Sequence, residues 1–308
     1  MLDAADQQQA AEIKTDNIRR HFSDGLDPFP NMTANNTMNT IAEFLKHTDL
    51  PKLEARMLVQ HLTGLSRAQL ITQDNAPLPS EIWAKLTALA QRRSAGEPMA
   101  YLLGGREFYG RWFKTTPATL IPRPETEHLV EAVMERLPQG GSVWDLGTGS
   151  GAIAVTLACE RPDAAVRASD ISREALAVAE ENARQLGAKV EFLQGSWFEA
   201  ERPSEKKAFD VIVSNPPYIE AGDEHLQQGD LRFEPQTALT DFSDGLSCIR
   251  ILAAEAGKHL KAGGWLLVEH GYNQGEAARQ IFTGQGWSGV VTLQDLAGLD
   301  RITLGCKV

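Results

Sequence analysis

Residues 142–160 read SVWDLGTGSGAIAVTLACE, and this stretch decides the fold class. The segment from Ser142 to Leu146 predicts a short buried strand, and the segment from Ala152 to Cys159 predicts the helix that follows it. Between them, glycines at alternate positions permit positive φ and let a ligand approach the backbone closely. The stretch therefore predicts a strand, a ligand-binding turn and a helix.

The alternation of strands and helices continues toward the C-terminus. Further strands are predicted at 166–169, 190–193, 209–214 and 264–269, and further helices at 173–186 and 245–259. Such alternation predicts an α/β fold with a doubly wound, mostly parallel sheet. The two final strands, 287–293 and 301–305, have no helix between them and predict an antiparallel edge.

The chain before this pattern divides into three parts. Residues 1–38 are polar and aperiodic, which predicts a flexible N-terminal extension. Apolar residues over 39–99 recur at spacings of three and four, which predicts a small all-helical domain. Aromatic residues interspersed with Gly and Arg over 100–122 predict a hairpin linker. Residues 123–308 then form the sheet domain.

Composition limits what the chain can bind. The formal net charge of -11 argues against duplex nucleic acid as the main partner, because phosphate binding needs many Lys and Arg residues. The three cysteines are scattered, so they predict neither a zinc site nor a disulfide framework. The sequence has no long apolar run and no secretion signal. We expect a monomeric cytoplasmic protein with no metal, no membrane contact and no stable nucleic-acid partner.

A carboxylate further along the chain gives the glycine-rich turn its meaning. Asp170 closes the next predicted strand, where its side chain can accept hydrogen bonds from both ribose hydroxyls of a nucleoside. Asp170 could instead be only the N-cap of the following helix, which is a common use of Asp. The turn, the strand and the carboxylate occur at the spacing of a nucleoside site, so ligand binding is favoured.

Asp145 helps to choose between two nucleoside ligands. A dinucleotide-binding pattern can be read from Gly149 to Ala154, but a pyrophosphate at this helix N-terminus would be repelled by the Asp145 carboxylate. The same carboxylate can interact with the positively charged methionine portion of S-adenosylmethionine. Trp197 follows the third strand and can lie along adenine, although a core or rim aromatic explains it nearly as well.

The acceptor side of the site is indicated by Asn215-Pro216-Pro217-Tyr218, directly after a predicted strand. An amide nitrogen is a poor nucleophile because its lone pair is delocalised, so both of its N–H bonds must be held. The Asn215 side-chain carbonyl can accept one N–H and the Pro216 carbonyl the other, while Tyr218 packs against the acceptor plane. The motif predicts methyl transfer to a planar amide-type nitrogen. A stiff turn without chemistry is the alternative.

With these motifs in this order, the chain resembles the peptide chain release factor glutamine N5-methyltransferases of the HemK type. The resemblance extends from about Thr40 to the C-terminus and includes Arg232-Phe233-Glu234-Pro235. It implies a seven-stranded methyltransferase sheet and an acceptor glutamine in the Gly-Gly-Gln loop of bacterial class I release factors. The expected contacts of S-adenosylmethionine are Asp145, Gly147, Thr148, Gly149, Ser150, Gly151, Asp170, Trp197 and Asn215. The expected contacts of the glutamine are Asn215, Pro216, Pro217 and Tyr218.

Two other functions remain open at this stage. A related enzyme could methylate a ribosomal-protein glutamine or the exocyclic amine of adenine, which offers a similar planar NH2 group. A non-catalytic or dinucleotide-binding module could share the fold, because function belongs to the site and not to the fold.

Overall fold

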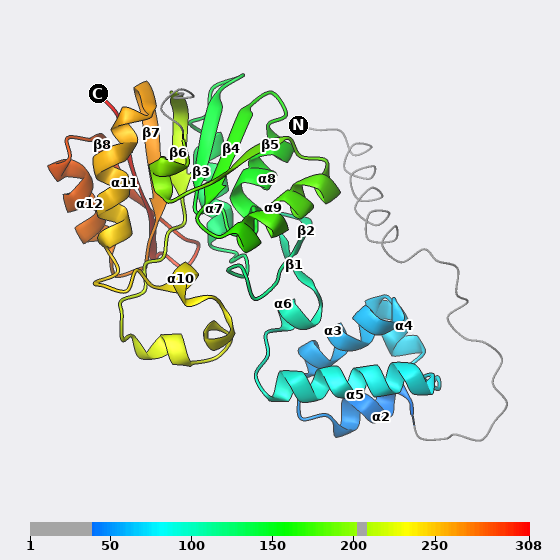
Figure 1. Ribbon diagram of the computed structural model, residues 1–308. Helices are drawn as coiled ribbons and strands as arrows, with labels where there is room; N and C mark the ends of the chain where they lie inside the picture. Colours follow the sequence, from blue (N-terminus) through cyan, green and yellow to red (C-terminus); the bar gives the residue numbers. More distant parts are fainter. Residues whose placement is uncertain (1–38, 202–207) are drawn as a thin grey trace. The chain divides into compact units, whose positions relative to one another are not determined.

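The structure of the protein is a computed structural model that describes residues 39–201 and 208–308 (Figure 1). The chain divides into two compact units between Ala95 and Gly96, somewhat earlier than the sequence places the boundary. The expected flexible extension, residues 1–38, lies outside the described residues.

The first unit is helical, as the sequence predicts. Its helices are α2 (Ile41–His47), α3 (Lys52–Thr63), α4 (Arg67–Thr72) and α5 (Ser80–Ser94). Phe44 of α2 packs edge-on against Trp83 of α5, with ring centroids 6.2 Å apart. Arg93 and Glu54 join α5 to α3 through two hydrogen bonds of 2.8 Å. Leu58 and Leu86 are fully buried and give the unit an apolar core of its own.

The second unit is built on a seven-stranded sheet in the order β5-β4-β3-β6-β7-β9-β8. Its strands are β3 (Ser142–Leu146), β4 (Ala165–Asp170), β5 (Val190–Gln194), β6 (Phe209–Ser214), β7 (Leu260–Glu269), β8 (Ser288–Gln294) and β9 (Asp300–Cys306). Strands β3 to β7 are parallel, whereas β9 is antiparallel to both β7 and β8. The predicted doubly wound sheet with an antiparallel edge is therefore confirmed.

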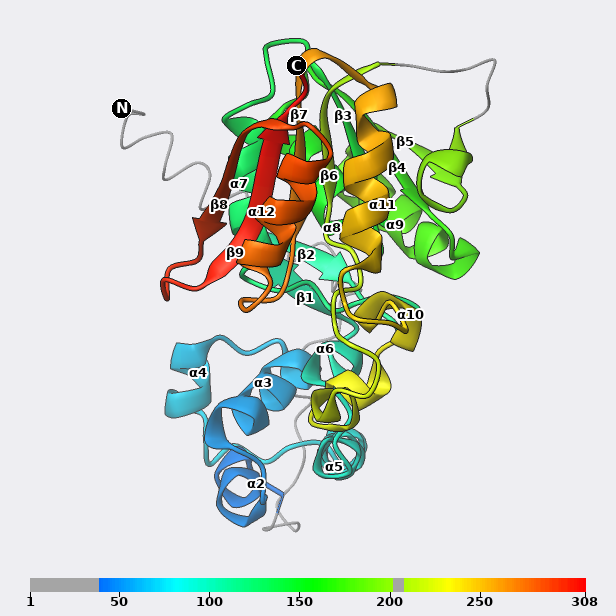
Figure 2. The ribbon, with the colours of Figure 1, turned by 90° about the vertical axis from the view of Figure 1, so that its left-hand side faces the viewer.

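Helices cover both faces of this sheet, because successive strand residues point to opposite sides. Val143 joins one apolar cluster with α7 (Thr126–Met134), α8 (Ala152–Glu160) and α9 (Arg173–Leu186). Trp144 joins the other cluster with α11 (Ser247–Glu255) and α12 (Gly275–Gly284). Figure 2 shows α11 and α12 in front of the strands and α7 and α8 behind them. The chain order reverses between β3 and β6, which makes the carboxyl ends of these two strands the switch point where ligands bind.

The segment before the sheet contains α6 (Met99–Leu102) and the antiparallel pair β1 (Gly105–Phe108) and β2 (Arg111–Lys114). The rings of Phe108 and Phe113 pack edge-on at 5.8 Å. Both side chains join the apolar cluster of α7 and α8. The hairpin is therefore anchored in the core of the second unit.

The structure corrects the bounds of two predicted elements and adds helices that the sequence did not predict. Helix α12 was not predicted, because glycines at both of its ends and a polar exposed face obscure its short apolar stripe. The predicted helix 245–259 is wrong at its end, because α11 gives way to the 3-10 helix η5 (Ala256–Lys258). Strand β7 begins at Leu260, since Gly263 and Gly264 do not interrupt it. Four short helices were also missed: η1 (Trp197–Ala200), η3 (Glu224–Gln227), η4 (Leu231–Phe233) and α10 (Gln236–Leu239).

Candidate active site

The glycine-rich turn leads from β3 into α8 and adopts the left-handed backbone that glycine favours. Gly147, Gly149 and Gly151 have φ values of 72°, 56° and 82°. A Cβ on Gly151 would lie 3.1 Å from Ala179 Cβ and from Val155 Cγ2, so the turn packs tightly against α9. A Cβ on Gly149 would meet no atom within 4 Å, so the space beside this residue is open.

Replacing Gly151 by alanine is expected to lower the free energy of unfolding by about 1–3 kcal/mol, because positive φ and crowding act together. Gly187→Ala is the matched control, since Gly187 has φ of 69° but no atom within 4 Å of a Cβ. Its loss should be smaller, about 1 kcal/mol. Urea unfolding measures both values, and equal losses would show that packing at Gly151 contributes nothing.

Asp145 is fully buried beneath this turn. Its Oδ2 accepts a 2.6 Å hydrogen bond from the Thr148 hydroxyl, whereas its Oδ1 is buried and has no partner among the described residues. Burial raises the pKa of Asp145 to about 7, although the Thr148 hydroxyl and the nearby Ala154 backbone N–H oppose that rise. A positively charged ligand would stabilise this carboxylate. The residues therefore fit the cationic methionine portion of S-adenosylmethionine.

Asp170 is joined directly to the glycine-rich turn. Its Oδ2 accepts a 2.9 Å hydrogen bond from the backbone N–H of Gly149, and its Oδ1 accepts one of 2.9 Å from Ser172. The N-cap of α9 is Ser172, whose hydroxyl accepts from the Ala175 backbone. Asp170 is therefore not the helix cap. Burial raises its pKa, although backbone hydrogen bonds oppose the rise.

Asp170→Ala is expected to weaken S-adenosylmethionine binding by about 1–3 kcal/mol, because charge-assisted hydrogen bonds to ribose are lost. Titration calorimetry measures this affinity directly. Asp163→Ala provides a matched control, because this carboxylate lies near the amino edge of the sheet and bonds the Gly140 backbone. Unchanged affinity for Asp170→Ala would remove Asp170 from the site.

The remaining expected cofactor contacts also lie at this edge. Trp197 begins η1 with φ of 45°, and its Cζ3 lies 3.8 Å from where a Cβ of Gly147 would be. The indole also packs against the apolar cluster of α11 and α12. Ser150 is buried, and its carbonyl accepts a 2.8 Å hydrogen bond from Asn182 of α9. These contacts place Trp197 beside the turn and join Ser150, which lies within it, to α9.

The Asn215-Pro216-Pro217-Tyr218 motif follows β6 on the other side of the switch point. The Ser214 hydroxyl donates a 2.7 Å hydrogen bond to the Leu146 carbonyl, which ties the ends of β6 and β3 together. Asn215 Nδ2 donates to the Thr126 hydroxyl at 3.1 Å, whereas Asn215 Oδ1 is buried and has no partner among the described residues. This oxygen is the group that the sequence predicts to accept a substrate N–H.

The rest of the motif is fixed by neighbouring loops. The Tyr218 carbonyl accepts a 2.9 Å hydrogen bond from Gln274 Nε2, which also bonds the Gly245 carbonyl at 3.2 Å. Burial raises the pKa of the Tyr218 hydroxyl, so this side chain stays neutral. Pro216 lies between these fixed residues and is itself buried. The motif is therefore rigid, as preorganised attack requires.

Sequence reasoning missed Thr126 and Gln274, which bond the motif, and the buried Glu269 beside it. Thr126 lies in the proline-rich helix start, which was interpreted only as a helix signal. Glu269 ends the apolar strand β7, and a carboxylate at the buried carboxyl end of a strand was the available signal. Gln274 follows a loop and has no recognisable sequence signal.

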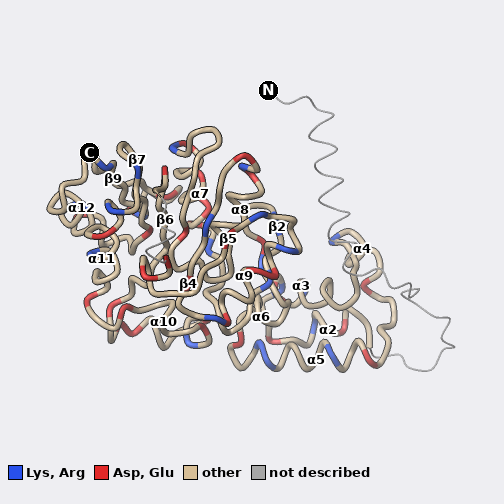
Figure 3. Tube along the Cα trace, turned by 45° about the horizontal axis from the view of Figure 1, so that its top comes forward, with Lys and Arg blue, Asp and Glu red and all other residues tan. Residues whose placement is uncertain are grey.

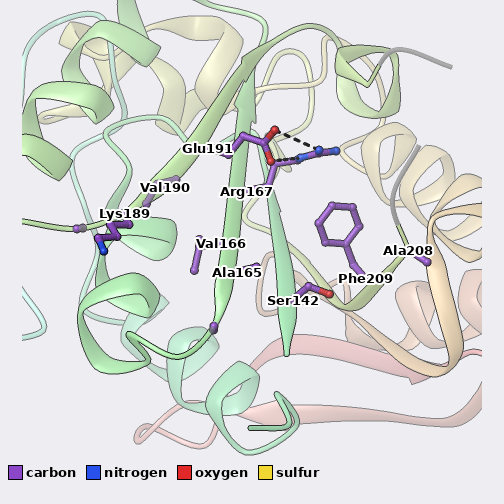
Figure 4. Close-up of a pocket in the computed structure, with 11 residues that line it drawn as sticks. Ser142, Ala165, Val166, Arg167, Lys189, Val190, Glu191, Ala208 and Phe209 are labelled. Atoms are coloured by element: carbon purple, nitrogen blue, oxygen red, sulfur yellow. Dashed lines mark hydrogen bonds and ion pairs between the residues drawn. The ribbon is translucent and has the colours of Figure 1, made fainter. Parts of the chain in front are cut away.

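A separate hollow lies at the opposite edge of the sheet (Figure 4). Its lining includes Ser142, Ala165, Val190 and Phe209, the first residues of β3, β4, β5 and β6. The buried Arg167 guanidinium pairs there with Glu191 at 3.1 Å and with buried Glu201 at 2.7 Å. The hollow lies away from the expected residues, and its ion pairs are satisfied, so we place no chemistry there.

Among the described residues, no cluster of His, Cys, Asp or Glu could hold a metal ion. Within 39–201 and 208–308, no helix is long and apolar enough to span a membrane. The described cysteines form no disulfide.

Comparison with known proteins follows the same division of the chain. Residues 37–104 match the PrmC N-terminal domain, and residues 124–231 match the methyltransferase small domain. A solved methyltransferase structure from Pyrococcus furiosus is 19% identical, covers 74% of this chain and 99% of its own, and superposes with a TM-score of 0.49.

Two curated relatives are much more similar in sequence. The release factor glutamine methyltransferase of Neisseria gonorrhoeae is 63% identical over 86% of this chain and 97% of its own length. The release factor glutamine methyltransferase of Bordetella pertussis is 52% identical over 87% of this chain and 99% of its own. The chain therefore belongs to the release factor glutamine methyltransferase family.

Proposed function

We propose that this chain transfers the methyl group of S-adenosylmethionine to the side-chain amide nitrogen, N5, of a glutamine in a peptide chain release factor. The acceptor is the glutamine of the Gly-Gly-Gln loop in bacterial class I release factors. Membership of the family supports this proposal, since its named relatives are release factor glutamine methyltransferases. We propose that the enzyme works in the cytoplasm, where translation termination takes place.

The observation that supports the proposal most directly is the buried, unpartnered Oδ1 of Asn215. A buried carbonyl oxygen without a partner is costly, and an incoming N–H donor removes that cost. A glutamine side chain supplies such a donor and presents its second N–H to the Pro216 carbonyl. Holding both N–H groups aims the nitrogen lone pair and stabilises the positive charge that develops on nitrogen.

S-adenosylmethionine supplies an electrophilic methyl group on a sulfonium centre. Asp170 would hold its ribose, and Asp145 would lie near its positively charged methionine portion. The turn from Gly147 to Gly151 would contact the cofactor through its backbone, and Trp197 would lie along adenine. The Asn215 backbone borders the same space. Residues Asn215 to Tyr218 would line the side of the site that binds the glutamine, where the Tyr218 ring would cover the plane of the glutamine amide.

Recognition of the protein substrate is assigned to the helical unit. We assign 39–99 to substrate recognition, 100–122 to the linker and 123–308 to catalysis. The helical unit contains none of the expected cofactor contacts, so binding the release factor is its most economical role. Acidic and basic positions are interspersed along the described chain (Figure 3), which agrees with a protein substrate and no stable nucleic-acid partner. We propose a monomer.

A competition assay tests the substrate class. Purified release factors, ribosomal proteins and DNA are incubated with the enzyme and labelled S-adenosylmethionine, separately and as a mixture. The proposal predicts that the label enters the release factor in both formats. Preferential labelling of a ribosomal-protein glutamine or of adenine would favour the alternative acceptors, and absence of labelling in every sample would favour a non-catalytic module.

A further inference from the structure

Three polar side chains meet at the carboxyl edge of the sheet behind the acceptor motif. Ser214 of β6 pairs with Val268 of β7, so the next residues, Asn215 and Glu269, lie side by side. Thr126, the first residue of α7, approaches them from the neighbouring helix. Thr126 is 4% exposed and Glu269 is 2% exposed, so water has little access to either group.

The hydrogen-bonding capacity of these groups determines how the Asn215 amide is turned. A carboxylate can only accept hydrogen bonds, and a threonine hydroxyl can accept one while donating its single proton. Asn215 Nδ2 donates to Thr126 Oγ1 at 3.1 Å, which leaves the Thr126 proton to be donated to the neighbouring Glu269 carboxylate. An amide turned the other way would place Oδ1 beside the Glu269 carboxylate and make it compete with that carboxylate for the single Thr126 proton. The amide NH2 group therefore faces Thr126 and Glu269.

We propose that Glu269 is a positioning residue that, together with Thr126, fixes the Asn215 amide so that Oδ1 faces the substrate nitrogen. The inference rests on the proposed function of Asn215. In the reversed orientation, the Asn215 NH2 group would oppose the glutamine NH2 group, and neither could accept. Glu269 thus controls methyl transfer without touching the substrate.

The electrostatic surroundings of Glu269 make this control dependent on pH. Burial raises the pKa of Glu269 to about 7, although Thr126, the charge of Arg301 and Asn215 lower it and Glu125 raises it further. Tyr218 also faces this carboxylate and stays neutral. Protonation turns Glu269 into a donor and removes its preference for the Asn215 NH2 group. The transfer rate should therefore fall as pH drops through about 7.

The test is the single-turnover rate of release-factor methylation across pH at saturating S-adenosylmethionine, which keeps Asp145 in contact with its cationic ligand. Glu269→Gln should lower the plateau rate by about 10- to 100-fold and abolish the fall at acid pH. The Michaelis constant for release factor and the affinity for S-adenosylmethionine should stay unchanged. Glu255→Gln, at a surface pair with Lys258, is the matched control and should retain the wild-type profile.

Thr126 provides a second, independent variant. Thr126→Val removes the hydroxyl at nearly constant volume and should lower the rate by about tenfold, whereas Thr126→Ser keeps the hydroxyl and should recover most of that loss. A Glu269→Gln enzyme with the wild-type plateau, or one that keeps the fall at acid pH, would overturn the positioning role. Absence of methylation by the wild-type enzyme would instead refute the proposed function, so the two failures are distinguishable.

Discussion

Replacing Asn215 by alanine should slow methyl transfer to release factor by about 100- to 1000-fold, the scale for removing one preorganised polar group from a transition state. The loss arises because the substrate amide no longer has an acceptor for one of its N–H bonds. The affinity for S-adenosylmethionine should fall much less, since Asp145 and Asp170 hold the cofactor. Single-turnover kinetics measure the first quantity and calorimetry measures the second.

Gln280→Ala is the matched control, because it removes an exposed side-chain amide on α12 whose bond to Glu276 spans 3.3 Å. The control enzyme should transfer methyl at the wild-type rate. If Asn215→Ala also transferred at that rate with both substrates saturating, Asn215 would not hold the acceptor nitrogen, and the mechanism would be wrong.

Removing the helical unit should lower kcat/KM for intact release factor by about 100-fold while leaving S-adenosylmethionine affinity near normal. A chain that begins at Gly96 keeps both apolar clusters of the second unit, which contain no residue of the first. It should therefore fold, and a cooperative thermal transition would show that it does. The loss follows because a single glutamine side chain offers too few atoms to select one protein.

Charge reversal tests the same role without deletion. Lys52, Arg56 and Arg67 are exposed on α3 and α4. Their combined replacement by glutamate should raise the Michaelis constant for release factor and leave kcat and cofactor affinity unchanged. Lys258→Glu is the control, because Lys258 ends η5 just before β7 begins, away from the carboxyl ends of the strands. Equal turnover of intact release factor by the full-length and truncated chains would return the helical unit to a scaffolding role.

Much of the fold follows from the sequence because each strand and helix has a local signal. Short runs with apolar residues predict β3, β4 and β6, and all three were placed within a residue or two. Helix α12 lacks such a signal, since its apolar stripe is short and becomes meaningful only against the sheet. The 3-10 helices between β6 and α11 depend on tertiary contacts, such as the Glu234 bond to the Ile121 backbone at 2.8 Å.

The site was predictable to the same extent. The glycine turn, Asp170 and the Asn215 motif each lie at the carboxyl end of a strand. The order of these strands brings them together at the switch point. The roles assigned to their side chains stay predictions. The proximity of Thr126 and Glu269 to Asn215 could not be read from the sequence, because these residues lie 89 and 54 positions from Asn215 in the chain. Thr126 bonds the Asn215 side chain directly. Only the register of β6 and β7 brings Glu269 beside Asn215.

The central claim is that the methyl group goes to the side-chain nitrogen of one glutamine in the release factor. The most direct measurement is fragmentation mass spectrometry of release factor after reaction with the enzyme and S-adenosylmethionine. The account predicts one added methyl group on the nitrogen of the Gly-Gly-Gln glutamine, and none when that glutamine is replaced by glutamate. A methyl group on another residue, or unchanged labelling of the replaced release factor, would contradict it.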